Sequence, residues 1–179
     1  HKSLQEVYDV NLRLIDLVKA LLSVARIELG TLAFTPEPSN IEKLAKDVAF
    51  ELRPTIAEKR LNFSEQYDPT IPSIPLDSDL THVIFQNLLT NAVKYTPEGG
   101  SVSLTIVRDG RYVLITVADT GYGVPKKQQK QLFTKLFRAD NARAKDTDGT
   151  GLGLYIVQSI VKASKGKVWF ESEENKGSA

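Results

Sequence analysis

The sequence of 179 residues contains no cysteine and only two histidines. Without cysteine there can be no disulfide framework, no thiolate zinc site and no cysteine nucleophile, and two histidines exclude a histidine-rich metal site. These absences fit a reducing, cytoplasmic setting. Methionine is also absent, so we expect the chain to be a piece of a longer protein.

Long apolar runs and an excess of charge of one sign are also missing. No stretch approaches the roughly 18 to 20 apolar residues that span a bilayer, and the first residues, HKSLQEV, lack a signal-peptide core. Lys plus Arg number 23 against 22 Asp plus Glu, so bulk charge predicts no nucleic-acid partner. Hydrophobic residues are 41% of the chain, enough to bury a core. The length predicts one folded domain with an appendage. We expect no membrane contact by this chain. Any membrane anchor of the parent protein would lie outside this piece.

Residues 1–30 predict one long helix with a wide apolar face. A face of this width is typical of a bundle helix that packs on an antiparallel neighbour or a dimer partner. Gly30 is placed to terminate the helix. Asn11 interrupts the apolar face, where its side chain either fixes the register of helix packing or is exposed to solvent. The apolar residues form two columns with alternating steps of three and four: Leu4, Val7, Leu14, Val18, Leu21 and Ala25, and beside them Tyr8, Ile15, Leu22 and Leu29.

Residues 31–179 predict a mixture of helices and strands in one domain. The fold class is α/β or α+β, with helices covering one face of a mixed sheet. The strongest local signal is the alternation of apolar residues around Asp109-Gly110, which predicts a β-hairpin. The expected elements are a helix from a capping box at Ser39 and Glu42 to a kink or end at Pro54, a strand at Leu61 and Phe63, a helix over about 79–95, hairpin strands at 102–106 and 113–117, a helix over about 153–163 and a strand over 167–172.

Two carboxamides share one face of the helix expected at about 79–95. Asn87 and Asn91 are one turn apart, and Lys94 and Tyr95 follow a turn later. A solvated stripe would ordinarily be charged, whereas carboxamide oxygens can ligate Mg²⁺ at low charge cost and a lysine can neutralise phosphate oxygens. Taken alone, this face is either a ligand site or an ordinary solvated surface.

Glycine-containing loops follow at two places. In VADTGYGVP, glycines spaced by one residue let the backbone approach a ligand, and Asp119 can accept a hydrogen bond; an ordinary turn is the alternative. In DTDGTGLGLYIV, glycines open an apolar helix whose unpaired N–H groups favour phosphate. The run is neither a Walker loop nor a Rossmann fingerprint. Between the two loops, Phe133 and Phe137 are expected on a short helix, and the polar residues 138–148 are typical of a mobile lid.

The order of these motifs resembles the N, G1, F and G2 boxes in the ATP-binding domain of bacterial sensor histidine kinases, members of the GHKL superfamily. The four motifs are Asn-x-x-x-Asn, Asp-x-Gly-x-Gly, Phe-x-x-x-Phe and Gly-x-Gly-x-Gly. The resemblance runs from about residue 1 to 178. It implies a Bergerat-type sandwich at 31–179 that lacks its last edge strand. It also implies that residues 1–30 are the second helix of a dimerisation and phosphoacceptor hairpin.

By this resemblance, four residues would carry the chemistry of a site that holds ATP and Mg²⁺. Asn91 would ligate Mg²⁺ through its side-chain oxygen, Lys94 would contact phosphate, and Arg138 could reach the γ-phosphate. Asn87 would occupy the position where ATP-hydrolysing relatives such as gyrase carry a general-base glutamate. Because an amide cannot take a proton from water, such a site is suited to passing phosphate on.

The resemblance also implies which residues bind the rest of the nucleotide. Tyr95 would lie near the adenine or ribose, and Asp119 would accept a hydrogen bond from the adenine amino group. Gly121 and Gly123 would let the loop pass under the base. With little covalent chemistry for the protein to perform, the rate would come from positioning and charge neutralisation. The phosphate side would be lined by Thr150, Gly151, Leu152 and Gly153.

The implied function is transfer of the ATP γ-phosphate to a histidine, for relay to an aspartate on a response-regulator receiver domain. The parent is expected to be a homodimer. The acceptor histidine of the family is followed by an acidic residue and an Arg-Thr-Pro-like turn, and no such box occurs in this sequence. His1 is expected to be an end residue and His82 a structural or surface residue. We therefore expect the chain to bind Mg-ATP without phosphorylating itself.

Three other functions stay open from the sequence. An ATPase of the same superfamily would release phosphate steadily without an acceptor, and a protein serine kinase would leave phosphoserine on a partner. A nucleotide-independent interaction module would have a decayed pocket, against which the intact set of Asn91, Asp119 and glycines argues. Calorimetry with a non-hydrolysable ATP analogue distinguishes such a module from the enzymes.

Overall fold

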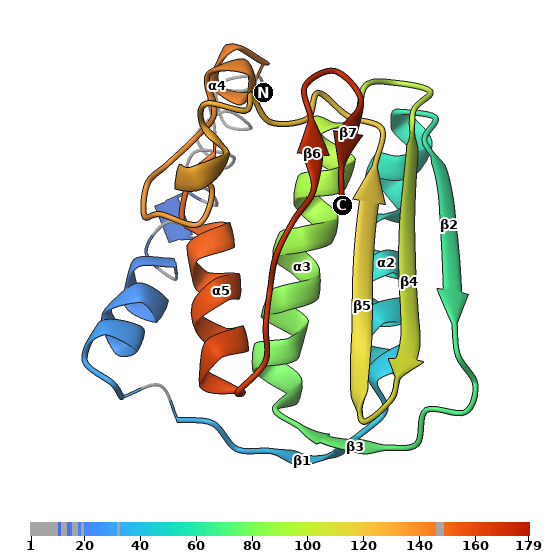
Figure 1. Ribbon diagram of the computed structural model, residues 1–179, viewed down its shortest axis with the longest axis vertical. Coiled ribbons are helices and arrows are strands. Elements are labelled where there is room, and N and C mark those ends of the chain that lie inside the picture. The colour runs from blue at the N-terminus through green and yellow to red at the C-terminus, as the bar shows by residue number, and fades with distance from the viewer. Residues whose placement is uncertain (1–10, 12–13, 16–17, 19, 32, 146–148) are drawn as a thin grey trace.

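The computed structural model describes residues 11, 14–15, 18, 20–31, 33–145 and 149–179 (Figure 1). Among them, no helix combines the length and apolarity that a bilayer crossing needs. Helical residues 20–28 come before the first labelled element. The elements that follow are β1 (Glu37–Ser39), α2 (Ile41–Glu58), β2 (Asn62–Tyr67), β3 (Ile74–Leu76), α3 (Ser78–Tyr95), β4 (Ser101–Asp109), β5 (Tyr112–Asp119), the 3₁₀ helix η1 (Gln129–Gln131), α4 (Asp140–Lys145), α5 (Gly153–Ala163), β6 (Ser172–Glu173) and β7 (Gly177–Ser178).

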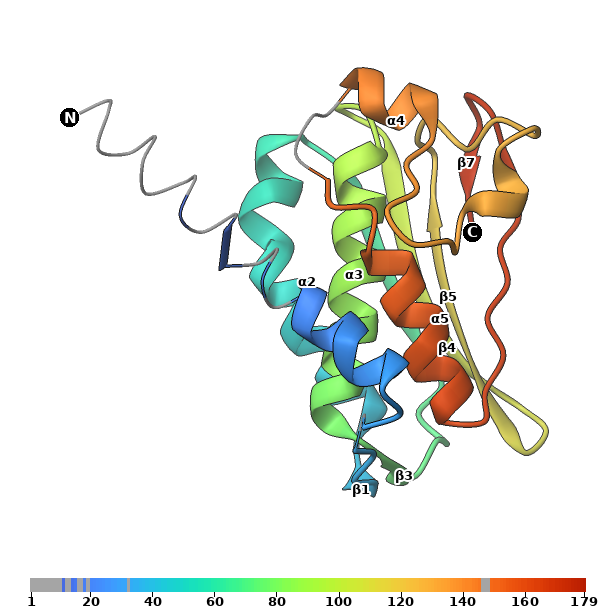
Figure 2. The same ribbon diagram turned by 90° about the vertical axis from the view of Figure 1, so that its left-hand side faces the viewer.

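A five-stranded mixed sheet forms one layer, in the order β2-β4-β5-β7-β6. Strands β2 and β4 are parallel, and the remaining neighbours are antiparallel. Helices α2, α3 and α5 form the second layer on one face of this sheet (Figures 1 and 2). The structure confirms the predicted class, the hairpin of β4 and β5, and the helices expected at 79–95 and 153–163.

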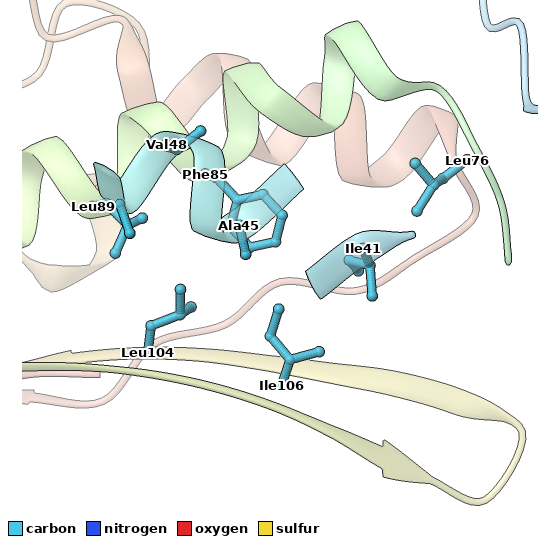
Figure 3. Packing of buried hydrophobic residues seen from close by; sticks show 9 residues of the cluster. Ile41, Ala45, Val48, Leu76, Phe85, Leu89, Leu104 and Ile106 are labelled. Carbon is cyan, nitrogen blue, oxygen red and sulfur yellow. The ribbon is translucent and has the colours of Figure 1, made fainter. Parts of the chain in front are cut away.

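The core lies between these two layers (Figure 3). Alternate residues of β4 point inward, so Leu104 and Ile106 are buried while their neighbours are partly exposed. They contact Phe85 and Leu89 of α3 and Val48 of α2 within one cluster of buried side chains. Because α3 is packed on both α2 and the sheet, it provides a fixed base for the polar residues on its remaining face.

The first long helix has a different N-cap from the predicted one, and it does not end at Pro54. Asn40 is the N-cap of α2 and accepts a hydrogen bond from the Lys43 N–H at 3.0 Å, so the predicted capping box at Ser39 is wrong. Ser39 instead belongs to β1, which pairs with β3. The helix also continues through Pro54 to Glu58. Proline removes one helical hydrogen bond, and two residues further on Ile56 is buried in a core cluster.

Side chains from distant parts of the chain bind both ends of α3. Asp77 is its N-cap and accepts hydrogen bonds from the Leu80 N–H at 2.9 Å and from both the N–H and the hydroxyl of Thr35 at 3.0 Å. Burial of this carboxylate opposes its ionisation, but these hydrogen bonds outweigh burial, so the pKa of Asp77 lies below its usual value. At the other end, Lys59 Nζ donates to the carbonyls of Val93 and Lys94 at 2.6 and 2.9 Å. Both ends of the helix dipole are thus matched by opposite charge.

The C-terminal strands are shorter than the sequence predicts. The strand expected at 167–172 is wrong for most of its length, because backbone pairing begins only at Glu171, which exchanges hydrogen bonds of 2.9 and 2.8 Å with Ala179. Strand β7 lies between β5 and β6 and pairs with β5 through Asp119 and Ser178. The turn between β6 and β7 contains Asn175 at φ +64°, a conformation that glycine adopts freely and asparagine tolerates. The expected lack of a further edge strand stays a prediction.

The helix that precedes the domain packs on α5 with a face other than its predicted apolar columns. Val24 is 7% exposed and lies in one cluster with Leu152 and Ile156. The column residues that the structure describes, such as Leu21 and Leu22, are exposed. The predicted terminator is confirmed, since Gly30 has φ +64° and the adjoining N–H groups close the last turn. The part of the predicted helix before position 11 lies outside the described part of the chain.

Candidate functional site

A cavity of about 340 Å³ opens between α3 and the α4–α5 region. It is bordered by the polar face of α3, the end of β5 and the glycine loop that follows, α4, and the start of α5. Two of the twelve predicted site residues, Gly121 and Leu152, do not line it. The ten that do are Asn87, Asn91, Lys94, Tyr95, Asp119, Gly123, Arg138, Thr150, Gly151 and Gly153.

The α3 wall of the cavity presents its two carboxamides differently. Asn87 Nδ2 donates to the Val83 carbonyl at 2.8 Å, which turns its oxygen toward α5. A Cβ on Gly153 would lie 2.4 Å from this Oδ1, so a side chain at that position would displace the Asn87 amide. Asn91 lies one turn further along the same wall, and Lys94 follows with its Nζ 5.8 Å from the ring centre of Tyr95. The polar face expected from spacing therefore borders a cavity and not bulk solvent.

At the end of β5, a half-buried carboxylate faces the cavity. Asp119 Oδ1 accepts a hydrogen bond from the Gly121 N–H at 2.7 Å. Burial raises the pKa of Asp119, and the hydrogen bonds from the Gly121 and Ser178 backbone offset only part of that rise. A carboxylate in this setting can accept hydrogen bonds from a ligand when it is ionised.

The glycines of the loop after β5 are explained by close packing against protein backbone. A Cβ on Gly121 would lie 2.5 Å from the Tyr95 carbonyl oxygen. Gly123 has φ +60°, and a Cβ there would overlap the Glu173 carbonyl. The Tyr122 N–H also donates to the Tyr95 carbonyl at 3.2 Å. The loop is thus held between the end of α3 and the β6–β7 turn, and this positions Asp119.

The two phenylalanines expected on a short helix do not lie on one. Residues 132–136 form turns after η1, and Leu136 has φ +58°. Both Phe133 and Phe137 nevertheless line the cavity, and Phe133 packs edge-on against Phe170 at 5.7 Å between ring centres. Residues 168–170 form a further, aromatic wall of the cavity. They were not predicted as site residues, because this segment pairs with no other strand and no local pattern shows which way its side chains point.

Part of the expected lid is a helix that is joined to the rest of the site. Asp140 and Gln128 exchange two hydrogen bonds, of 2.5 and 3.0 Å. Asn141 donates to the carbonyls of Tyr122 and Gly123. These contacts connect α4 with the loop after β5. Asn141 was not predicted as a site residue, and the remaining lid residues, 146–148, lie outside the described chain.

The N-terminus of α5 closes the cavity opposite Asn87. Gly151 has φ +69° and leaves no room for a Cβ beside Leu136. The N–H of Leu152 donates to Thr150 Oγ1 at 3.3 Å, and the first N–H bonded within the helix is that of Ile156. The N–H groups of the first turn therefore have no helical partner and can bind an anion. Leu152 itself points into the core with 2% exposure, which is why it does not line the cavity.

Known proteins share this arrangement of helices and sheet. Residues 76–179 match the family model described as histidine kinase-, DNA gyrase B-, and HSP90-like ATPase. The adaptive-response sensory kinase SasA of Synechococcus sp. (strain JA-3-3Ab) is 35% identical over 91% of this chain and 43% of that protein. Full-length ShkA, solved in complex with AMPPNP, superposes with a TM-score of 0.83 and 31% identity over 99% of this chain and 36% of that one. The histidine kinase ThkA, solved with the response regulator TrrA, has a TM-score of 0.72 at 22% identity, over 99% of this chain and 49% of that one.

The chain belongs to the family of histidine kinase-, DNA gyrase B- and HSP90-like ATPases. SasA is a sensory kinase and ThkA a histidine kinase, and the predicted Bergerat-type sandwich is confirmed by the solved structures. The chain spans less than half the length of the curated relative it matches. Within this length the chain contains the ATP-binding domain that defines the family.

Proposed function

We propose that this chain is the catalytic part of a sensor histidine kinase, which transfers the γ-phosphate of ATP to a histidine on another segment. The observation that carries the proposal is the set of polar groups around the cavity. Asp119 is the only described residue lining it that has a carboxylate side chain. Asn87, which faces the start of α5, cannot take a proton from water. A site without a general base at its phosphate end favours transfer over hydrolysis.

The two ends of the cavity suit the two ends of a nucleotide. Asn87 meets the start of α5, and the carbonyl of Tyr95 meets the loop that positions Asp119. These two residues are eight apart, or about 12 Å along α3. We assign the purine to the Asp119 end and the phosphates to the α5 end, where helix N–H groups and Arg138 border the cavity. Lys94, beside Tyr95, is a second cation on the cavity wall.

Asn91 is the proposed Mg²⁺ ligand. Among the described residues, no group of three or more His, Cys, Asp or Glu side chains could hold a metal ion. The donors would therefore be a carboxamide oxygen and the phosphates themselves, a set that suits Mg²⁺. Bound there, Mg²⁺ would neutralise charge on the phosphate oxygens.

Replacing Asn91 with alanine should remove most of the gain in nucleotide affinity that Mg²⁺ produces, about 10-fold or more, because one metal ligand is lost. Calorimetric titration with a non-hydrolysable ATP analogue, with and without Mg²⁺, measures this gain. Gln86→Ala on an exposed position of the same helix is the control. An unchanged Mg²⁺ dependence in Asn91→Ala would mean that Asn91 does not bind the metal.

Incubation with γ-labelled ATP should leave this chain unlabelled, because no acceptor box occurs in its sequence. Adding a separate acceptor helix should produce label on the histidine of that helix, and a receiver domain should then take it up on aspartate. Label on this chain alone would contradict the proposal. Steady phosphate release without an acceptor would favour an ATPase, and phosphoserine on a partner a serine kinase.

The partners of the whole protein are proposed from the same comparison. The ThkA complex with TrrA supports a response regulator as the kind of partner. The exposed apolar columns at Leu14, Val18 and Leu21 support a bundle partner for residues 1–30, which we assign to the second hairpin helix of a homodimer. We place this part of the protein in the cytoplasm, where ATP and a receiver domain would be available.

A further inference from the structure

Asn141 joins two walls of the cavity through its side-chain amide. It lies in α4 and lines the cavity. Its Nδ2 donates to the Gly123 carbonyl at 2.9 Å and to the Tyr122 carbonyl at 3.3 Å. An amide nitrogen has two hydrogens, so these two bonds use its full donor capacity. The pair of carbonyls also fixes the orientation of the amide, because a flipped amide would bring its oxygen against two other acceptors.

The amide oxygen of Asn141 is left with no donor. Oδ1 is buried and accepts no hydrogen bond from any described residue. Most buried polar atoms in proteins are paired, because a buried group without a partner loses the hydrogen bonds it made to water. An acceptor in this state, on a residue that lines a cavity, is suited to a ligand that brings a donor.

The chemistry of a nucleotide limits where such a donor can come from. The phosphate oxygens of ATP are acceptors near neutral pH and cannot pair with an amide oxygen. The donors are the amino group of the base and the hydroxyls of the ribose, both in the nucleoside part. Asn141 contacts the loop of Tyr122 and Gly123, the loop that follows Asp119, so it lies at the end of the cavity assigned to the nucleoside.

We propose that Asn141 is a further nucleotide-binding residue, whose Oδ1 accepts a hydrogen bond from the nucleoside part of the ligand while its Nδ2 holds α4 against the loop after β5. The inference rests on the proposed function and adds a specificity contact to it. A ligand that lacks the matching donor would leave the oxygen buried and unpaired, so Asn141 would discriminate among nucleotides by their amino or hydroxyl groups.

The test compares the dissociation constants of ATP and three analogues for the wild-type chain and for Asn141→Ala. The analogues are 2′-deoxy-ATP, 3′-deoxy-ATP and the purine triphosphate without the 6-amino group. We expect one analogue to bind the wild type more weakly than ATP does. The ratio of the dissociation constants of this analogue and ATP should be about 3- to 10-fold smaller for Asn141→Ala than for the wild type. The analogue that shows this coupling identifies the donor.

Gln128→Ala is the matched control. It removes the two hydrogen bonds between Gln128 and Asp140 of α4, and it leaves the Asn141 oxygen in place. It should lower the affinity for all four nucleotides by one common factor and keep their ranking. If Asn141→Ala also acts uniformly, or changes no affinity, the oxygen has no ligand contact and the inference is overturned. If the wild-type chain binds no nucleotide at all, the proposed function itself fails, which is a separate outcome.

Discussion

Replacing Asp119 with alanine should weaken nucleotide binding about 10- to 150-fold, equivalent to about 1.5 to 3 kcal/mol. Asp119 is the carboxylate at the proposed purine end of the cavity, where the loop glycines hold it in place. Its loss would leave the base amino group without an acceptor in a site shielded from water. Titration of the folded variant with an ATP analogue measures the change.

Asp109→Ala is the matched control, since it removes an exposed aspartate from the far end of the same hairpin. It should leave nucleotide affinity unchanged. Equal affinities for the wild type and Asp119→Ala would refute the assignment of the purine to this end of the cavity.

The same carboxylate should make binding depend on pH. Burial raises the pKa of Asp119 above the usual value of an aspartate, about 3.9. Since the ionised form is the better acceptor, affinity should be full above the raised pKa and should fall as pH is lowered through it. This loss should begin at a higher pH than the titration of an exposed aspartate. Asp119→Asn, which cannot ionise, should flatten this part of the profile.

Replacing Phe85 with alanine should lower the free energy of unfolding by about 3 to 5 kcal/mol. Phe85 is fully buried between α2, α3 and β4 (Figure 3), so its removal leaves a cavity that rigid elements on three sides cannot fill. Phe50, which is 66% exposed on α2, is the matched control, and Phe50→Ala should change stability by less than about 0.5 kcal/mol.

Urea unfolding of both variants measures the difference. Nucleotide affinity of Phe85→Ala, taken where the protein is still folded, should fall less than that of Asp119→Ala, because Phe85 does not line the cavity. A stability loss no larger than that of Phe50→Ala would show that the α3–sheet interface is not the main core.

Several elements could be predicted because their signals are local. The alternation in β4, the two-residue turn at Gly110 and the apolar stripes of α3 and α5 each reflect a period that the backbone imposes. The polar face with Asn87 and Asn91 follows from the same helical period. The glycines before α5 predicted an anion site because the unpaired N–H groups at the start of a helix favour phosphate, and this site stays a prediction.

Other features could not be predicted because they depend on residues far apart in the chain. Asp77, the N-cap of α3, is also held by Thr35, which lies 42 residues away in the sequence. Leu152 has the spacing of a site residue, yet it is buried because Val24 and α5 pack around it. Gly121 was expected beneath a ligand, and its lack of a side chain is explained by the Tyr95 carbonyl.

The sequence by itself determined the helices, the hairpin and the types of group available for phosphate and purine, since each depends on neighbours a few residues away. Only the tertiary structure decided which of those groups share a cavity, and it added Asn141 and the aromatic wall at 168–170. The physical reason is that side-chain orientation, burial and hydrogen-bond partners are set by packing between elements. That packing cannot be predicted from a local sequence pattern.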